Sequence, residues 1–281
     1  MNSFRAEFKK RLGQPGLVVA PGVFEMVSLR LADRMNFEAL YMTGYGTVAS
    51  LMGLPDAGLA TYTDMVGRVT AMAGMALRQR QVVAVVACQD GRREAGCQGQ
   101  LEDQEFPKKC GHTPGRRVIP LEDMVKKIEV AVNSRTDPNF QIIARTDART
   151  TLGLDEALRR GEAYAKAGAD ILFIESPESV DEMQKICQTF RGTPLVANMV
   201  EKGRTPVLSK EDLEKLGYKI AIFPVTALLA SVQAMTKVYE QFKTTGSSVD
   251  QAVELYDFGD LSKLMGFEDV WEFEKKFVET K

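Results

Sequence analysis

"FQIIART" (140–146), "LDEALRRGEAYAKAGA" (154–169) and "DILFIES" (170–176) are neighbouring stretches that together indicate the fold. The first and the last are short apolar runs rich in isoleucine, which is typical of strands buried on both faces. The stretch between them has apolar residues at helical spacing and ends near a glycine, a common helix stop. A strand, a helix and a second strand in succession predict two parallel strands joined by a helix.

The same alternation extends over most of the chain. Five further strand-like runs occupy residues 17–22, 38–44, 81–88, 194–200 and 219–226, and "GQLED" (99–103) is the candidate for an eighth strand. Stretches with helical spacing lie at 25–35, 61–77, 121–135, 179–192, 209–217 and 226–246. Eight such units in 281 residues predict an α/β fold of the closed (β/α)8 TIM-barrel type rather than an open doubly wound sheet.

The C-terminal end of the chain lies beyond the last predicted strand. Residues 1–245 are therefore assigned to the barrel and residues 246–281 to a helical extension. The extension is amphipathic and contains the single tryptophan, Trp271. We expect it to pack on a neighbouring subunit, and packing on its own barrel is the alternative.

Composition and charge exclude several classes of function. The net charge is −2 with no basic block, so neither nucleic acid nor a polybasic membrane contact is expected. No apolar run approaches the ~20 residues that span a bilayer. The four cysteines, at 88, 97, 110 and 187, have no C-x-x-C spacing, which argues against a zinc knuckle. The charged start lacks the apolar core of a signal peptide, so a cytoplasmic protein is predicted, with a mitochondrial address as the alternative.

Polar residues recur where the predicted strands end, and in a barrel these ends meet at one mouth. They are Thr43, Asp56, Asp90, Glu102, Asp103, Arg145, Thr146, Asp147, Glu175, Asn198 and Thr226. Converging carboxylates repel one another unless a cation lies among them, and oxygen ligands suit Mg²⁺ or Mn²⁺. Arg145 is suited to binding a substrate carboxylate with its planar fork. The alternative is that these residues are ordinary loop acids that cap helices.

Two short motifs need separate interpretation. "GYGTVA" (44–49) matches a dinucleotide fingerprint after a strand, but the match is weak and "SLMGLPDAG" follows where a clean helix is needed. "LEDQEFPKKCGH" (101–112) places Cys110 beside two lysines and the only histidine, His112. Neighbouring cations favour the thiolate, so Cys110 is predicted to be a reactive acid/base or nucleophile rather than a structural thiol.

Four motifs carry a resemblance to a known family. "GLPDAG" (53–58), "LEDQEFPKKCGH" (101–112), "IARTDA" (143–148) and "FIESP" (173–177) resemble the isocitrate lyase/phosphoenolpyruvate mutase superfamily, and "KKCGH" resembles its lyase branch. The resemblance implies a (β/α)8 barrel whose last helices are swapped between subunits in a dimer of dimers. It also implies Mg²⁺, small di- or tricarboxylate substrates, an enolate-like intermediate and a mobile loop over the site.

The resemblance further implies a role for each matching position. Cys110 is the general acid/base, and Lys108, Gly111 and His112 belong to the gating loop. Asp56 and Glu102 hold the metal, and Arg145 binds the substrate carboxylate. Glu175 and Asn198 complete the pocket, and Thr43, Gly44 and Tyr45 contact the carboxylate or enolate end.

One segment departs from the family pattern. Where the family has an Asp-x-Asp motif followed by a full helix, this chain has only "CQDGRREAG" (88–96), so the third strand–helix unit is shortened. Asp90 is either a metal ligand or a turn residue. If the shortening is real, weak metal binding and low activity are expected.

The resulting prediction is a Mg²⁺-dependent carbon–carbon lyase acting on a 2-hydroxydicarboxylate of the 2,3-dimethylmalate or 2-methylisocitrate type. Within enzymes, the alternatives are an oxaloacetate hydrolase and a mutase of the carboxyphosphonoenolpyruvate or phosphoenolpyruvate type. A barrel with an incomplete metal site and impaired catalysis is the alternative from another class.

Overall fold

The computed structural model describes residues 3–76, 82–85, 99–113 and 115–278. The chain forms two compact units, Met1–Ala227 and Leu228–Lys281, and each is considered by itself. The shortened segment 88–96, including Asp90, lies outside the described residues, so the predictions made for it stay predictions.

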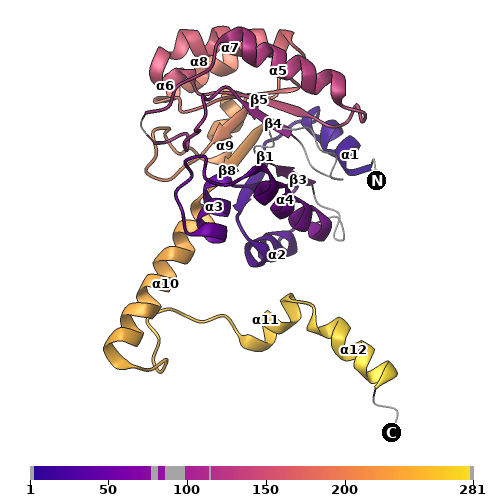
Figure 1. The fold of residues 1–281 in the computed structure, drawn as a ribbon, viewed down its shortest axis with the longest axis vertical. Coiled ribbons are helices and arrows are strands. Elements are labelled where there is room, and N and C mark those ends of the chain that lie inside the picture. The colour runs from indigo at the N-terminus through magenta and orange to yellow at the C-terminus, as the bar shows by residue number, and fades with distance from the viewer. Residues whose placement is uncertain (1–2, 77–81, 86–98, 114, 279–281) are drawn as a thin grey trace. The chain divides into compact units, whose positions relative to one another are not determined.

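Among its described residues, the first unit contains eight strands, which are arranged in a ring. The strands lie at the centre of the unit with helices around them (Figure 1). They are β1 Val18–Val23, β2 Ala39–Met42, β3 Val82–Val85, β4 Gly99–Glu102, β5 Ile142–Thr146, β6 Ile171–Ile174, β7 Val196–Asn198 and β8 Ile220–Phe223. Parallel pairing gives one sheet in the order β3-β2-β1-β8-β7 and another in the order β4-β5-β6. A parallel bridge between Leu172 and Leu195 joins the two sheets at β6 and the segment before β7.

Each predicted strand run overlaps one of these strands, and the candidate eighth run contains β4. The strands follow one another around the ring in chain order, which is the topology of a (β/α)8 barrel. The predicted fold class is therefore confirmed.

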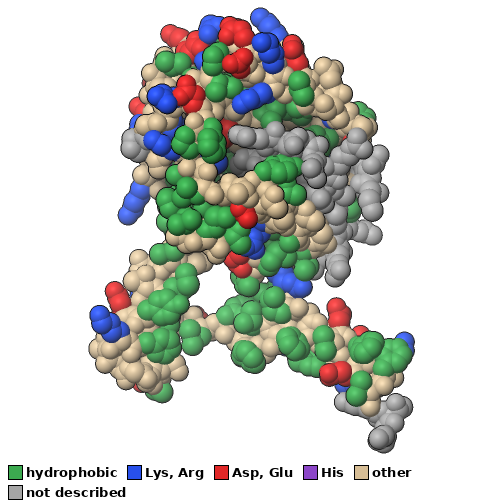
Figure 2. Space-filling view, in the orientation of Figure 1, with side chains coloured by type: hydrophobic (Ala, Val, Ile, Leu, Met, Phe, Trp, Pro, Cys, Tyr) green, Lys and Arg blue, Asp and Glu red, His purple; other side chains and the backbone are tan. Residues whose placement is uncertain are grey.

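The described helices of the first unit lie around the strands (Figure 1), and all but α1 come after the strand β1 in the chain. They are α1 Ser3–Leu12, α2 Met26–Arg34, α3 Gly44–Met52, α4 Tyr62–Ala76, α5 Leu121–Ser134, α6 Ala148–Leu152, α7 Leu154–Lys166, α8 Val180–Thr189 and α9 Lys210–Leu216, and α10 Thr226–Thr245 begins in this unit. Several start at a hydroxyl side chain that accepts a backbone N–H of the first turn, as Thr43 does for α3 and Ser179 for α8. Lys, Arg, Asp and Glu side chains lie interspersed over the α5, α7 and α8 side of the surface (Figure 2).

The barrel interior is filled by alternate residues of the strands. Buried side chains in it include Val18, Ala20, Ala39, Tyr41, Ile143, Ile171, Phe173, Val196, Ile220 and Ile222. Phe8 and Leu12 of α1 belong to the same cluster, so α1 closes the amino-terminal end of the barrel. Because that end is closed by apolar packing, a polar site is left to the opposite end.

Two further apolar clusters join the helices to the outer face of the strands. One contains Met124 of α5, Tyr164 of α7 and Ile186 of α8. The other contains Leu29 of α2 and Met72 of α4. Burying a large apolar side chain contributes about 1.5–3 kcal/mol, so these layers hold the strand ends in fixed positions.

The second unit comprises most of α10 with α11 Phe258–Leu264 and α12 Phe267–Phe277. The predicted boundary at residue 245 falls at the last residue of α10, whereas the two compact units divide between Ala227 and Leu228. Large apolar side chains of this unit are exposed, among them Phe258, Trp271, Phe273 and Phe277. Hydrophobic side chains are visible on the surface of this unit (Figure 2). Packing of this unit on a neighbouring subunit stays a prediction. In the described part of the chain, no helix combines the length and the apolar character needed to cross a membrane.

Candidate active site

The barrel mouth is lined by side chains that continue the inward alternation of the strands. Ala39 and Tyr41 of β2 point into the barrel, so Thr43 follows at its rim. The same spacing continues from Ile143 to Arg145 in β5. It also places Glu102, Glu175, Asn198 and Pro224 at the ends of β4, β6, β7 and β8. Side-chain periodicity therefore brings together residues that lie far apart in the sequence.

These residues surround a cavity of about 70 Å³. It is lined by Tyr41, Thr43, Gly44, Tyr45, Asp56, Glu102, Lys108, Lys109, Cys110, Gly111, His112, Arg145, Asn198, Val200, Pro224 and Val225. Each described residue to which the resemblance assigns a role lines this cavity except Glu175, which is buried against His112 and Arg145. The structure thus brings these positions together, while their roles stay proposals.

The segment between β4 and α5, residues 103–119, is a loop whose two ends pair with each other through backbone hydrogen bonds. The N–H of Glu105 donates to the carbonyl of Arg117 over 2.9 Å, and the N–H of Ile119 donates to the carbonyl of Asp103 over 2.8 Å. This antiparallel pairing holds the tip of the loop at the cavity. The tip carries Lys108, Cys110 and His112. We call residues 103–119 the β4–α5 loop.

Gly111 allows the tip of this loop to approach the charged residues closely. A Cβ atom on Gly111 would lie 2.4 Å from Nη2 of Arg145 and 2.7 Å from Cδ of Glu175. The carbonyl of Gly111 also accepts a hydrogen bond from Oγ of Ser176 over 3.0 Å. The close approach therefore depends on the missing side chain.

His112 connects the loop to Glu175 through a defined tautomer. Its Nδ1 accepts the backbone N–H of Arg204 over 3.1 Å, so the ring proton is assigned to Nε2. Nε2 lies 3.2 Å from Oε1 of Glu175 and can donate to it. Nδ2 of Asn198 donates to the same carboxylate over 3.2–3.3 Å.

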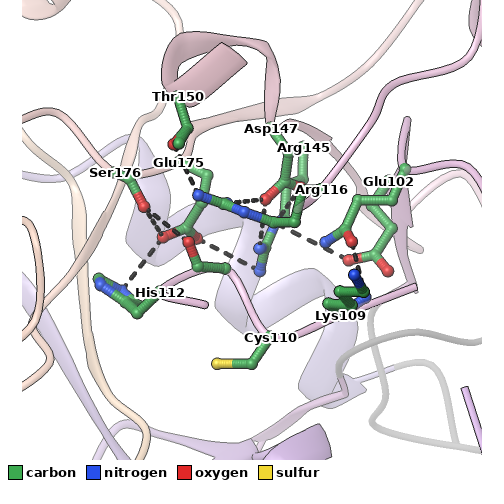
Figure 3. Close-up of polar contacts among 12 residues, drawn as sticks. Glu102, Lys109, Cys110, His112, Arg116, Arg145, Asp147, Thr150, Glu175 and Ser176 are labelled. Carbon is green, nitrogen blue, oxygen red and sulfur yellow. Dashed lines mark hydrogen bonds and ion pairs between the residues drawn. The ribbon is translucent and has the colours of Figure 1, made fainter. Parts of the chain in front are cut away.

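Arg145 lies between two carboxylates at the centre of the cluster (Figure 3). Its Nε and Nη2 each donate to Asp147 over 2.8 Å, and its Nη1 lies 3.2 Å from Oε2 of Glu175. Burial disfavours ionisation of Glu175, but Arg145 and His112 outweigh it and hold the pKa of Glu175 well below its usual range. Likewise, burial opposes the charge of Arg145, but Asp147 and Glu175 raise its pKa. Both groups are therefore charged at neutral pH.

The predicted metal ligands Asp56 and Glu102 lie at the same mouth as the ammonium of Lys108. Nζ of Lys108 lies 3.0 Å from Oδ1 of Asp56, and Glu102 lies close enough to raise the pKa of Lys108 against the effect of burial. The pKa of Glu102 is raised chiefly by burial, with further contributions from Asp147 and Asp56. Within the described ranges no cluster of three or more His, Cys, Asp or Glu residues is arranged to hold a metal.

Cys110 differs from its predicted state. The sequence places cations beside it and predicts a thiolate, but burial raises the pKa of the thiol. The backbone N–H of His112 and the charge of Arg145 only partly oppose that effect. Cys110 is therefore a protonated thiol at neutral pH, which suits it to donating a proton rather than to acting as a ready nucleophile.

A family profile described as phosphoenolpyruvate phosphomutase matches residues 8–243. The chain belongs to the phosphoenolpyruvate mutase/isocitrate lyase family. Among its relatives, 2,3-dimethylmalate lyase of Eubacterium barkeri is 44% identical over 286 residues, covering 97% of this chain and 98% of the relative. A 2-methylisocitrate lyase of Aeropyrum pernix is 37% identical over 293 residues, covering 97% of this chain and 93% of the relative.

Solved structures of the family share the fold. A 2,3-dimethylmalate lyase has a TM-score of 0.89 at 30% identity, covering 98% of this chain and 96% of its own. An oxaloacetate acetylhydrolase bound to 3,3-difluorooxalacetate has a TM-score of 0.90 at 27% identity, covering 98% and 97%. A phosphonopyruvate hydrolase solved with oxalate and Mg²⁺ shares the fold alone, with a TM-score of 0.84 at 24% identity over 98% of this chain and 99% of its own.

"GYGTVA" begins a nine-residue helix, α3, which ends at Met52, so "GLPDAG" interrupts it as the sequence indicates. Of the polar residues expected at the mouth, Asp103, Thr146, Asp147 and Thr226 do not line the cavity. Asp103 does not face the mouth, because its carboxylate accepts hydrogen bonds from Arg160 and Tyr164 of α7. Thr226 donates to Glu201 and does not line the cavity.

The structure also adds residues that sequence reasoning missed. Tyr41 lies two residues before Thr43, so strand periodicity could have identified it. Arg116 and Ser176 contact site residues, but no motif distinguishes them. Gly203, from the loop after β7, lies against the ring of His112, and nothing in its local sequence signals that contact.

Replacing Gly203 with alanine is expected to weaken catalysis without unfolding the barrel. The new Cβ would lie 2.7 Å from Nδ1 of His112, so the ring must move and lose the N–H of Arg204. A lost hydrogen bond is worth about 1 kcal/mol, so a roughly fivefold fall in kcat/KM is expected in steady-state kinetics. Gly74→Ala, in open space on α4, is the control, and equal kinetics for the two variants would contradict the assignment.

Proposed function

We propose that this chain is a carbon–carbon lyase that cleaves a small 2-hydroxydicarboxylate of the 2,3-dimethylmalate or 2-methylisocitrate type into a 2-keto acid and a carboxylic acid. The observation that carries the proposal is a protonated Cys110 thiol at a cavity with Arg145 and Asn198. The 44% identity to a 2,3-dimethylmalate lyase over almost the whole chain supports the substrate class.

The cavity supplies groups for both ends of such a substrate. The first turn of α3 presents backbone N–H groups near Gly44 and Tyr45, and a helix N-terminus favours a carboxylate. Oδ1 of Asn198 is buried without a hydrogen-bond partner, so it can accept a hydrogen bond from a substrate hydroxyl. Asp147 occupies the Nε–Nη2 edge of Arg145 and Glu175 lies 3.2 Å from Nη1, so a substrate carboxylate would share the Nη1–Nη2 end of the guanidinium with Glu175.

Cleavage requires a proton donor at carbon. A carboxylate at the mouth, Asp56 or Glu102, takes the proton of the C2 hydroxyl directly or through water. The C2=O bond forms as the C2–C3 bond breaks, so a 2-keto acid separates and the C2–C3 electron pair is left on C3, next to a carboxylate. The Cys110 thiol then gives its proton to C3, which yields the carboxylate product and leaves a thiolate. A thiol whose pKa is raised by burial holds that proton at neutral pH until the carbanion forms.

The residues at the mouth also fit a hard divalent cation. Asp56 and Glu102 offer carboxylate oxygens, and the raised pKa of buried Glu102 indicates a site that favours added positive charge. Mg²⁺ or Mn²⁺ held by these two residues and water would stabilise the negative charge that develops on the enolate-like species. Lys108 bonds to Asp56 in this structure, so it would give up that contact when a cation binds.

Oxaloacetate hydrolysis is the second candidate, because the oxaloacetate acetylhydrolase has a TM-score of 0.90 with this chain. A phosphoenolpyruvate- or carboxyphosphonoenolpyruvate-type mutase is disfavoured by "KKCGH" (108–112), which resembles the lyase branch. The third possibility, a barrel with impaired catalysis, depends on residues 88–96.

The activity test is a coupled assay for 2-keto acid release. The panel contains 2,3-dimethylmalate, 2-methylisocitrate, isocitrate and oxaloacetate, each with Mg²⁺ and with EDTA. We expect turnover of one of the first two substrates, and loss of that turnover in EDTA that added Mg²⁺ or Mn²⁺ restores. Oxaloacetate as the only substrate would favour the hydrolase, and a folded protein with no turnover would favour the impaired barrel.

The proposal extends to the setting of the enzyme. We propose a homotetramer built as a dimer of dimers, in which the C-terminal unit packs on a neighbouring subunit. The exposed aromatic residues of α12, including Trp271 and Phe273, support this arrangement. The ligand is a small di- or tricarboxylate rather than nucleic acid or membrane, and a cytoplasmic location fits such a substrate.

A further inference from the structure

A second cluster of buried charges lies directly behind Arg145. The carboxylate of Asp147 is fully buried between two arginines. Arg145 donates to it from Nε and Nη2, and Nη1 of Arg116 donates to Oδ1 over 2.6 Å. Nη2 of Arg116 donates to Oγ1 of Thr150 over 2.6 Å (Figure 3).

The backbone of Asp147 is fixed as well. Its N–H donates to Oδ1 of Asp103 over 2.9 Å, and Oγ1 of Thr146 donates to Oδ2 of Asp103 over 2.7 Å. Arg160 and Tyr164 of α7 donate to that same Oδ2. Asp147 is therefore held from both sides, by the start of the β4–α5 loop and by its returning limb.

This arrangement decides which edge of Arg145 faces the cavity. Asp147 takes the Nε–Nη2 edge, and Nη1 is left facing Glu175. Without the charge of Asp147, the guanidinium would be drawn toward Glu175 and toward Glu102, whose Oε2 lies 3.7 Å from Nε. Neither Asp147 nor Arg116 lines the cavity, so neither can touch a substrate held there.

We propose that Asp147 is a positioning residue that sets the orientation of the Arg145 guanidinium, and that Arg116 holds Asp147 in place. Because Arg116 lies on the returning limb of the β4–α5 loop, the pair also links that loop to Arg145. The kinetic consequence rests on the proposed lyase function, whereas the orientation of Arg145 does not.

The test compares Asp147→Asn with a matched control at the other end of the barrel. Asp170 also accepts hydrogen bonds from an arginine, Arg135, over 2.6 Å, and from the N–H of Ile142 at the start of β5. Asp170→Asn removes a similar charge pair far from the mouth. We expect Asp147→Asn to lower kcat/KM by about 10²-fold, as a misplaced catalytic group does. Asp170→Asn should change melting temperature but leave kcat and KM near the wild-type values.

Two further readouts distinguish positioning from stability. Oxalate, a probe with two carboxylates, should bind Asp147→Asn more weakly than wild type in calorimetry with Mg²⁺ present. NMR without ligand measures how fast the Nε–H proton of Arg145 exchanges with water, and the loss of its resonance in Arg145→Lys assigns it. This proton should be protected from exchange in wild type and should lose that protection in Asp147→Asn. Arg116→Lys should lower kcat/KM and Nε–H protection less than Asp147→Asn does. In the double variant the two losses of kcat/KM should not add, because both substitutions act on the same contact.

The experiments test the positioning role of Asp147 separately from the proposed lyase function. A wild-type chain without lyase turnover overturns the proposed function, and the Nε–H protection still decides the role of Asp147. Unchanged protection in folded Asp147→Asn would overturn the inference. So would a loss of kcat/KM in Asp170→Asn equal to that in Asp147→Asn, since the effect would then follow stability.

Discussion

Cys110→Ser is expected to lower kcat by roughly 10²–10⁴-fold, the range over which a positioned acid or base contributes. Serine keeps the size of the side chain, but its hydroxyl is a much weaker acid than a thiol and gives up a proton to carbon far less readily. The measurement is 2-keto acid release under saturating substrate and Mg²⁺. Oxalate affinity should stay close to the wild-type value, because Cys110 is expected to act on the carbanion and not on the carboxylates.

Cys187→Ser is the matched control for this prediction. Cys187 is a buried free cysteine of α8, and burial raises its pKa to about 12. It lies away from the cavity, so its replacement should leave turnover unchanged. Alkylation by iodoacetamide, followed by peptide mapping, should be slow for Cys110 at neutral pH and accelerate in alkaline buffer, because a raised pKa keeps the thiol protonated. Full turnover by Cys110→Ser would remove the cysteine from the mechanism.

The fold could be predicted from the sequence because most strand runs are short apolar segments followed by a helix signal; the run at 81–88, which lacks the helix signal, and the polar "GQLED" (99–103) are the exceptions. The site could be predicted in part for the same reason, since period-two alternation carries Thr43, Arg145 and Glu175 to one mouth. The same alternation predicts that Glu102 and Asp103 face opposite sides of the strand, so only one of them can point to the mouth. Adjacent residues in a strand face opposite sides, and Asp103 points to α7.

The other differences between the sequence-based predictions and the structure come from burial and from contacts between residues far apart in the chain. Lys108 and His112 suggested a cationic setting for Cys110, but desolvation outweighs nearby charge when a thiol is buried. Lys108 bonds to a carboxylate 52 residues away, a contact that no local pattern encodes. Arg204 and Gly203 orient His112 from the loop after β7, so the state of the only histidine depends on a distant segment.

Gly111→Ala is the second change with a large expected effect, because its Cβ enters the centre of the charged cluster. The methyl group would lie 2.4 Å from Nη2 of Arg145 and 2.7 Å from Cδ of Glu175, both well inside van der Waals contact. Neither partner can yield easily. Glu175 is held by Arg145, His112 and Asn198, and Arg145 is held by Asp147.

The tip of the β4–α5 loop must therefore move away, and Cys110 and His112 must move with it. Displacement of a reacting group by about 1 Å costs about 10²-fold in rate, so kcat/KM should fall by at least that factor. Overpacking should also lower the free energy of unfolding by about 1–3 kcal/mol, seen as a reduced melting temperature. Gly67→Ala on α4, whose Cβ meets open space, is the control and should retain activity. Wild-type kcat and KM in Gly111→Ala would show that the loop lies farther from Arg145 in the working enzyme. If activity is lost, a shift of the loop in a crystal structure of the variant would confirm that the collision causes the loss.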